Sequence, residues 1–166
     1  MNFIWCPSPN FDERPPNTVI DTVVLHYTDM KSAALSLERL CDPLSKVSAH
    51  YLIDEDGTAY QLVLEEKRAW HAGVSQWRGR ENVNHFSIGI ELQNPGYFYF
   101  QQFGQWFPYS SAQYQALVQL LYFLKGRYPL IVNNTVGHND VAPQRKIDPG
   151  PHFNWEILQE NGFRKA

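Results

Sequence analysis

The chain of 166 residues has the length of one ordinary globular domain and carries a formal net charge of −3 at pH 7. Hydrophobic residues make up 43% of the chain and charged residues 19%, a balance that excludes a disordered protein. Its apolar runs fall short of the roughly 20 residues needed to cross a bilayer, which excludes a transmembrane segment. Because the charges form no basic stripe, nucleic acid is not an expected partner.

The first segment, residues 1–20, is polar and rich in proline, so we expect an irregular N-terminal arm lying on the domain. It lacks the basic and long apolar regions of an export signal, and Cys6 follows a bulky tryptophan. We therefore expect a cytoplasmic protein, with the periplasm or envelope as the alternative if a signal has been removed. Cys6 and Cys41 lie outside any CxxC pair, which predicts unreactive thiols rather than a disulfide framework.

The first predicted elements alternate between strand and helix. Residues 21–28 (DTVVLHYT) are rich in β-branched residues and predict a buried strand, whereas residues 31–41 contain helix formers. Residues 48–63 contain one apolar run before and one after a Glu-Asp-Gly turn, which predicts a hairpin. Residues 87–92 (SIGIEL) predict another strand, with its apolar residues on one face and its small and acidic residues on the other.

A long aromatic segment and the clearest helix follow. Residues 94–108 are interrupted by glycine and proline, which predicts a long loop or irregular hairpin. Ser110 and Gln113 have capping-box spacing at the start of an apolar stripe with helical period, and Pro129 ends that stripe. The pattern therefore predicts a helix between Ser110 and Pro129.

The C-terminal part predicts a short strand at residues 130–132, a loop, and a last helix at residues 154–159 that Gly162 ends. Strands and helices are thus interleaved along the whole chain. This order predicts an α/β fold: a single domain over residues 1–166, with a central mixed β-sheet flanked by helices.

Three residues stand out as candidate metal ligands. His26 lies in a strand of otherwise apolar residues, where an unpaired imidazole is costly. His138 follows Gly137, which lets the backbone approach closely, and Asp148 lies in the proline-restricted segment KIDPGP. Two histidines and one aspartate match the ligand count of a catalytic zinc with an open fourth position. Structural roles for each of the three residues are the alternative.

Two further charged residues complete the candidate site. Lys146 lies two positions before Asp148, so in an extended segment both side chains point the same way. Glu91 shares a strand face with Ser87 and Gly89, small residues that leave space for a substrate. A carboxylate in such a strand is either paired structurally or kept as a general base.

A family resemblance rests on several blocks that occur in order: VVLHYT, VSAHYLIDEDG, RAWHAGVSQWRG, NHFSIGIEL, GHNDVAPQRKIDPGP and FNW. They resemble the N-acetylmuramoyl-L-alanine amidase family of type 2, which includes phage T7 lysozyme, the peptidoglycan recognition proteins and the bacterial AmpD and AmiD enzymes. The block APQRKIDPGP looks most similar to the AmiD branch. The resemblance covers about residues 15–160 and implies the mixed α/β fold of these proteins.

The resemblance also implies an activity and a role for each candidate. It implies zinc-dependent hydrolysis of the amide bond between N-acetylmuramic acid and L-alanine, in peptidoglycan or its muropeptide fragments. One Zn²⁺ per chain is implied on His26, His138 and Asp148. Glu91 is implied to polarise the water at the zinc, and Lys146 to stabilise the oxyanion of the tetrahedral intermediate.

Other polar residues have weaker assignments. Trp70, His71 and Asn84 are candidates for lining the substrate cleft, although a structural role suits each of them equally well. His50 is expected to pack beneath the metal site, and Asp140 to hold a turn rather than a metal. Two other functions stay open: a peptidoglycan-binding module that has lost catalysis, and a zinc amidase that acts on a different amide.

Overall fold

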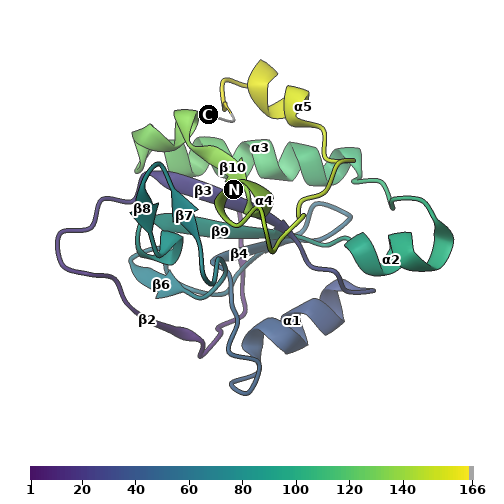
Figure 1. The fold of residues 1–166 in the computed structure, drawn as a ribbon, viewed down its shortest axis with the longest axis horizontal. Coiled ribbons are helices and arrows are strands. Elements are labelled where there is room, and N and C mark those ends of the chain that lie inside the picture. The colour runs from purple at the N-terminus through teal and green to yellow at the C-terminus, as the bar shows by residue number, and fades with distance from the viewer. Residues whose placement is uncertain (165–166) are drawn as a thin grey trace.

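The computed structural model describes residues 1–164 and has a twisted β-sheet at its centre (Figure 1). The strands of this sheet are β1 (Ile4–Trp5), β3 (Thr22–Tyr27), β4 (Tyr51–Ile53), β5 (Ala59–Gln61), β9 (Ser87–Leu92) and β10 (Thr135–Gly137). They lie in the order β1-β5-β4-β9-β3-β10, and β4 with β5 is the antiparallel pair among otherwise parallel neighbours. The mixed sheet expected from the sequence is therefore confirmed.

Helices and small sheets surround this centre. The α-helices are α1 (Ala33–Cys41), α2 (Gly96–Phe103), α3 (Ser111–Lys125), α4 (His138–Val141) and α5 (Trp155–Glu160). Two 3₁₀-helices are η1 (Val83–His85) and η2 (Pro129–Asn133). Strand β2 (Phe11–Glu13) pairs with β6 (Lys67–Ala69), and β7 (Gln76–Trp77) pairs with β8 (Arg80–Glu81). Figure 1 shows α3 and α5 on one side of the sheet and α1 on the other.

The two faces of the sheet have different tasks because strand side chains alternate between them. One face packs against α3 and forms the main core, with Leu25 of β3, Ile90 of β9 and Leu120 of α3 all fully buried. The opposite face carries His26 and Glu91, which are register partners on β3 and β9. The His26 and Glu91 side chains therefore lie on one face of the sheet, and the apolar side chains of the other face form the main core.

Helix α3 begins as its sequence predicts. The Ser110 hydroxyl accepts a hydrogen bond from the Gln113 amide at 3.0 Å, and the Gln113 side chain accepts one from the Ser110 amide at 3.2 Å. This reciprocal capping box satisfies two amide groups that the first turn leaves without helical partners. The predicted helix start is therefore confirmed.

The segment 94–108 differs from its prediction as a loop or irregular hairpin, because it contains helix α2. Pro95 and Gly104 border this helix, and the left-handed φ of 70° at Gly104 ends it. The helix-breaking residues therefore mark its ends, and Gly96 alone falls in its first turn, where backbone amides need no helical partner.

Two other predicted segments also differ. Residues 130–132 lie in the 3₁₀-helix η2 rather than a strand, since Pro129 fixes the φ of its first residue. The strand comes later, as β10, within a stretch expected to be loop. The N-terminal arm is also not wholly irregular, because β1 pairs with β5 and β2 with β6. Short edge strands of two or three residues give little alternation to read in a sequence.

The two cysteines, distant in sequence, lie side by side. The sulfur atoms of Cys6 and Cys41 are 3.8 Å apart, and burial followed by the Cys6 hydrogen bond raises the pKa of the Cys41 thiol to about 12. A raised thiol pKa agrees with the expectation of unreactive thiols.

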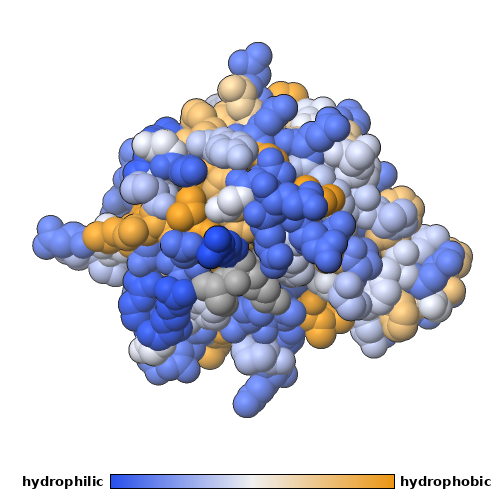
Figure 2. Space-filling view, turned by 90° about the horizontal axis from the view of Figure 1, so that it is seen from above, coloured by the Kyte–Doolittle hydropathy of each residue, from blue (hydrophilic) through white to orange (hydrophobic). Residues whose placement is uncertain are grey.

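Among residues 1–164, no helix is long and apolar enough to span a bilayer. The face seen in Figure 2 is largely polar, with small apolar patches.

The capping box gives a first prediction. Replacing Ser110 by alanine removes the side-chain oxygen that accepts the Gln113 amide, so we expect the free energy of unfolding to fall by about 1 kcal/mol. Chemical denaturation of Ser110→Ala and of Ser111→Ala, an exposed neighbour without that role, measures the difference. Equal stability of the two variants would contradict the importance of the cap.

Candidate metal centre

Strand pairing brings the two predicted histidine ligands together at the carboxyl ends of parallel strands, where open α/β sheets place their ligand sites. The register of β10 beside β3 pairs Gly137 with Leu25, so His138 leaves the sheet next to His26. A Cβ on Gly137 would lie 2.7 Å from Pro149 Cδ. The glycine therefore allows the loop that carries Asp148 to approach β10.

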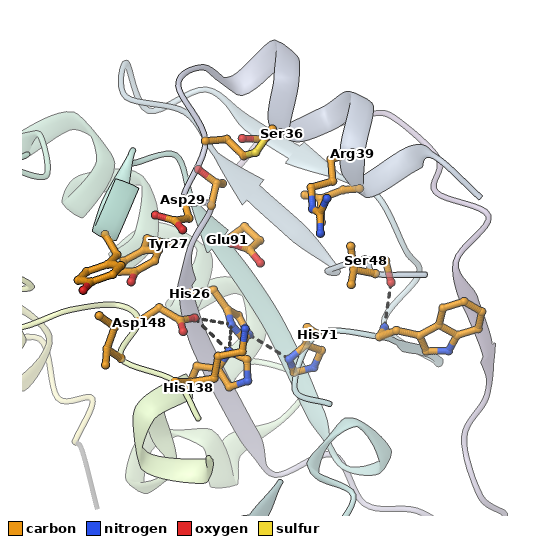
Figure 3. Close-up of a pocket in the computed structure, with 18 of the residues that line it drawn as sticks. His26, Tyr27, Asp29, Ser36, Arg39, Ser48, His71, Glu91, His138 and Asp148 are labelled. Atoms are coloured by element: carbon orange, nitrogen blue, oxygen red, sulfur yellow. Dashed lines mark hydrogen bonds and ion pairs between the residues drawn. The ribbon is translucent and has the colours of Figure 1, made fainter. Parts of the chain in front are cut away.

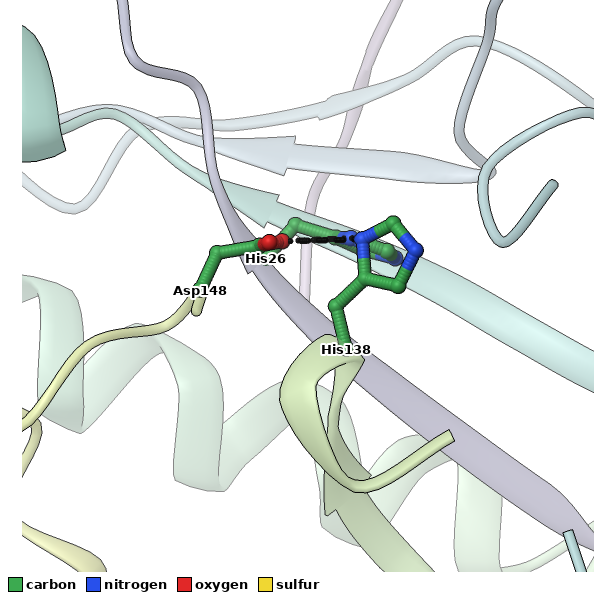
Figure 4. A group of neighbouring side chains, drawn as sticks. All are labelled: His26, His138 and Asp148. Atoms are coloured by element: carbon green, nitrogen blue, oxygen red, sulfur yellow. Dashed lines mark hydrogen bonds and ion pairs between the residues drawn. The ribbon is translucent and has the colours of Figure 1, made fainter. Parts of the chain in front are cut away.

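His26, His138 and Asp148 converge on one point (Figure 4). Asp148 Oδ2 lies 2.9 Å from His26 Nδ1 and 3.1 Å from His138 Nδ1, and the two Nδ1 atoms are 2.9 Å apart. All three side chains are buried, and their ligand atoms lie within 4.8 Å of one another. The predicted group is therefore assembled in space as one that can hold a metal ion.

The donor chemistry of this group fits a metal ion. His138 Nε2 lies 3.0 Å from the Ala72 carbonyl, which can only accept a hydrogen bond, so His138 Nε2 carries the proton and Nδ1 offers a lone pair. That lone pair meets the carboxylate of Asp148, which is itself an acceptor. A neutral imidazole and a carboxylate facing the same point are ligands that a divalent cation satisfies.

Protonation states suit the same role. Burial, followed by the neighbouring His138, lowers the pKa of His26 to about 4, so its imidazole is neutral at pH 7. Burial raises the pKa of Asp148, but the two imidazoles beside it, His138 and His26, outweigh that effect and hold this pKa well below its usual range. The group therefore presents a carboxylate and the neutral imidazole of His26, which are forms that bind metals.

The group lies in a cavity of about 720 Å³ between α1 and the sheet (Figure 3). Glu91, Lys146 and Trp70 also line this cavity. Lys146 and Asp148 thus face the same space, as their spacing in the sequence predicts. A cavity of this volume is large enough to enclose a small-molecule ligand.

Glu91 lies beside the metal-ligating group with an uncommitted oxygen. Its Oε2 is shielded from solvent and has no hydrogen-bond partner among residues 1–164. Burial, followed by the negative charge of Asp148, raises the pKa of Glu91 well above its usual range, and the charges of Lys146 and Arg39 oppose this rise. A carboxylate with a raised pKa and a free oxygen in a cavity favours a proton-transfer role over a structural pair.

His71 lines the cavity, whereas Asn84 lies behind it. A Cβ on Gly89 would lie 2.4 Å from the His71 ring, so the space expected for a substrate beside Ser87 and Gly89 is filled by His71 itself. Asn84 does not line the cavity; its Oδ1 accepts hydrogen bonds from the amides of His71 at 3.2 Å and Ala72 at 2.8 Å. Asn84 therefore supports the site from behind, by holding the backbone of His71 and Ala72.

Two other expectations concern residues near the site. His50 is fully buried, its Nδ1 accepts a hydrogen bond from the Gly89 amide at 3.0 Å, and its ring packs 5.9 Å from that of His71. It therefore lies beneath the site, as expected. Asp140 Oδ2 accepts a hydrogen bond from the Gly137 amide at 2.8 Å, which holds the turn into α4.

Arg39 is a cavity residue that the sequence did not single out. It belongs to the last turn of α1, and Figure 3 shows its guanidinium directed into the cavity, with Glu91 between it and the metal-ligating group in this view. Within residues 1–164 this guanidinium makes no hydrogen bond or ion pair. No local sequence signal marks it, because only the packing of α1 decides which of its polar residues face the cavity.

Comparisons with known proteins agree with this geometry. The profile of the N-acetylmuramoyl-L-alanine amidase family (Amidase_2) matches residues 16–151. The chain is 50% identical to the 1,6-anhydro-N-acetylmuramyl-L-alanine amidase AmpD of Enterobacter cloacae, over 90% of this chain and 84% of that protein.

Solved structures give the same relationship. A selenomethionine derivative of AmpD superposes with a TM-score of 0.83 and 36% identity, covering 96% of this chain and 93% of that one. AmiD from E. coli, in complex with the substrate anhydro-N-acetylmuramic acid-L-Ala-D-gamma-Glu-L-Lys, superposes with a TM-score of 0.79 and 36% identity, covering 93% of this chain and 66% of that one. Relatives thus include both AmpD and AmiD proteins.

The geometry predicts one divalent metal ion per chain. Elemental analysis of the purified protein after dialysis should give one equivalent of metal, and His26→Ala should lose it because one of three ligands is gone. His85→Ala is the control, since His85 lies outside the cavity. Full metal content in His26→Ala would contradict the assignment.

Proposed function

This chain belongs to the N-acetylmuramoyl-L-alanine amidase family, and we propose that it is a zinc hydrolase that cleaves the amide bond between N-acetylmuramic acid and L-alanine in peptidoglycan or its muropeptide fragments. The observation that carries the proposal is one cavity that holds both a metal-ligating group and the uncommitted oxygen of Glu91. The family match at residues 16–151, together with the pairing of β1 and β2 with later strands, supports one amidase domain over residues 1–166.

Zinc is the metal that best fits two imidazole nitrogens and one carboxylate oxygen, and three protein ligands leave a position open for catalysis. Bound by His26, His138 and Asp148, a zinc ion supplies Lewis acidity, which allows water to act as a nucleophile at neutral pH. The remaining steps depend on proton transfer and charge stabilisation by the side chains of this chain.

Glu91 is the proposed general base and acid. Its Oε2 takes a proton from the attacking water as the new C–O bond forms at the amide carbon. The same oxygen then gives that proton to the nitrogen of L-alanine as the C–N bond breaks. A raised pKa suits both halves of this exchange, because the carboxyl group must hold the proton between the two transfers.

Lys146 is proposed to stabilise the oxyanion that forms on the amide carbonyl oxygen. It lines the same cavity, and its charge lowers the pKa of both Glu91 and His26, so its ammonium group lies close to the reacting centre. A cation placed where negative charge develops in the transition state stabilises that state more than the bound substrate.

Arg39 is proposed to bind the peptide part of the substrate. The ligand of the AmiD complex contains a D-gamma-Glu directly after L-Ala, and a γ-linkage leaves the α-carboxylate of that residue free. Arg39 offers an unpaired guanidinium across the cavity from the metal-ligating group. A guanidinium binds a carboxylate through two parallel hydrogen bonds. The arrangement therefore suits the α-carboxylate of the residue that follows L-alanine.

The function is tested with that same muropeptide. Mass spectrometry should find anhydro-N-acetylmuramic acid and the free peptide, whose masses together exceed that of the substrate by one water. A second substrate with an ordinary muramic acid end shows whether the anhydro form is preferred. Binding without products would instead identify a peptidoglycan-binding module. The cytoplasmic location expected from the sequence stays a prediction, which fractionation of cells producing the native protein tests.

The role of Glu91 gives a kinetic prediction. Glu91→Gln keeps the shape of the side chain but removes the base, so turnover should fall by about 10²–10⁴-fold. Metal content and melting temperature should stay near those of the unmodified protein, because Glu91 is not a ligand. A folded, metal-loaded Glu91→Gln variant that retains its turnover would rule out the proposed mechanism.

Arg39 and Lys146 should differ in their kinetic effects. Arg39→Ala should raise KM about tenfold. This is the lower end of the effect expected for losing a hydrogen bond to a charged group, because Arg39 is exposed to solvent. Lys146→Ala should instead lower kcat by about 10²–10³-fold. The matched control is a substrate whose glutamyl α-carboxylate is an amide: if Arg39→Ala raises KM equally for both substrates, Arg39 does not bind that carboxylate.

A further inference from the structure

We propose that His71 and Ser87 are positioning residues that fix which nitrogen of His26 carries its proton, and that the adjacent Ala72 does the same for His138. The two ligands would then present Nδ1 lone pairs to the metal before the ion binds. This inference rests on the metal site of the proposed function, and it concerns metal affinity rather than the identity of the substrate.

The argument starts at the far end of a buried chain of hydrogen bonds. Ser87 Oγ lies 2.7 Å from the carbonyl oxygen of Val83. Two oxygens at this distance share a hydrogen, and a carbonyl has none to give. The Ser87 hydroxyl therefore donates to Val83, and its proton is committed.

The direction of the next two hydrogen bonds follows from the first. Ser87 Oγ also lies 3.1 Å from His71 Nε2, and with its own proton committed it can only accept, so His71 Nε2 carries a proton. His71 is buried without a carboxylate partner, which favours the neutral ring and leaves a lone pair on Nδ1. That lone pair accepts from His26 Nε2 at 3.1 Å, so His26 Nδ1 is the unprotonated nitrogen facing Asp148.

The second ligand, His138, is oriented by Ala72, the residue that follows His71 in the chain. His138 Nε2 donates to the Ala72 carbonyl at 3.0 Å, and Arg145 Nη2 donates to the same carbonyl at 2.8 Å. Asn84 Oδ1 accepts from the amides of both His71 and Ala72. The dipeptide His71-Ala72, whose two backbone amides are held by Asn84, thus orients both histidine ligands.

The space for this arrangement is built into β9. Gly89 lies against the His71 ring so closely that a Cβ there would come within 2.4 Å of it. Ser87 lies on the same face of the strand, and its hydroxyl oxygen accepts the hydrogen bond from His71 Nε2. The small residues of β9 therefore accommodate the positioning residue, and outer partners of this kind typically change metal affinity by about 10–100-fold.

The first test measures zinc affinity by competition with a chromogenic chelator, without any substrate. Ser87→Ala leaves His71 Nε2 without its acceptor, so we expect zinc to bind about 10–100-fold more weakly. Ser87→Thr keeps a hydroxyl and should restore the affinity. Ser8→Ala is the matched control, because Ser8 is also buried and donates to a backbone carbonyl, that of Leu40, away from this chain of hydrogen bonds.

Wild-type affinity in a folded Ser87→Ala variant would overturn the proposal, as would an equal loss in Ser87→Ala and Ser8→Ala. If Ser87→Ala does not fold, the unmodified zinc-loaded protein decides by NMR of its ¹⁵N-labelled histidines. We expect the His71 proton on Nε2, and finding it on Nδ1 would overturn the proposal. Neither measurement uses amide hydrolysis, so failure of the proposed function and failure of this inference give different results.

Discussion

The parallel pairing of β3 with β9 on one side and β10 on the other is the constraint on which the site depends. Because side chains alternate along a strand, this pairing sends Leu25 and Ile90 into the core beneath α3 and sends His26 and Glu91 to the opposite face. A slip of one residue would bury His26 among apolar side chains and expose Leu25 to the cavity. The apolar core therefore fixes the register, and the register fixes the spacing of His26 and Glu91.

Burying several histidines beside carboxylates is unfavourable unless each polar atom has a partner. Here His26 is hydrogen-bonded to His71, His71 to Ser87, and His138 to the Ala72 carbonyl. Glu91 Oε2, shielded and without a hydrogen-bond partner in residues 1–164, is an exception, and Glu91 lines the cavity. Hydrogen-bonded histidines around one unpaired carboxylate oxygen are the arrangement that preorganised catalysis requires.

The loop that supplies Asp148 is braced by aromatic rings. His152 stacks between Trp106 and Tyr109, with ring centroids 4.7 and 4.9 Å away, and the Tyr109 hydroxyl donates to the Pro149 carbonyl at 2.8 Å. The segment after α2 thereby connects the loop to the main core. Ligand atoms must be held closely to bind a metal well, and this stack helps hold a ligand that comes from outside the sheet.

The sequence by itself determined the features that depend on local pattern and on residue type. Alternation in SIGIEL identified β9, the Ser110 and Gln113 pair identified the start of α3, and the chemistry of His26, His138 and Asp148 identified a metal-ligating set. Only the tertiary structure decided the rest. Helix α2 is mostly aromatic and is bordered by Pro95 and Gly104, β10 is too short to show alternation, and the direction of Arg39 depends on how α1 packs. The space at Gly89 is visible in the sequence, but that His71 fills it follows from a contact between distant segments, which no local pattern encodes.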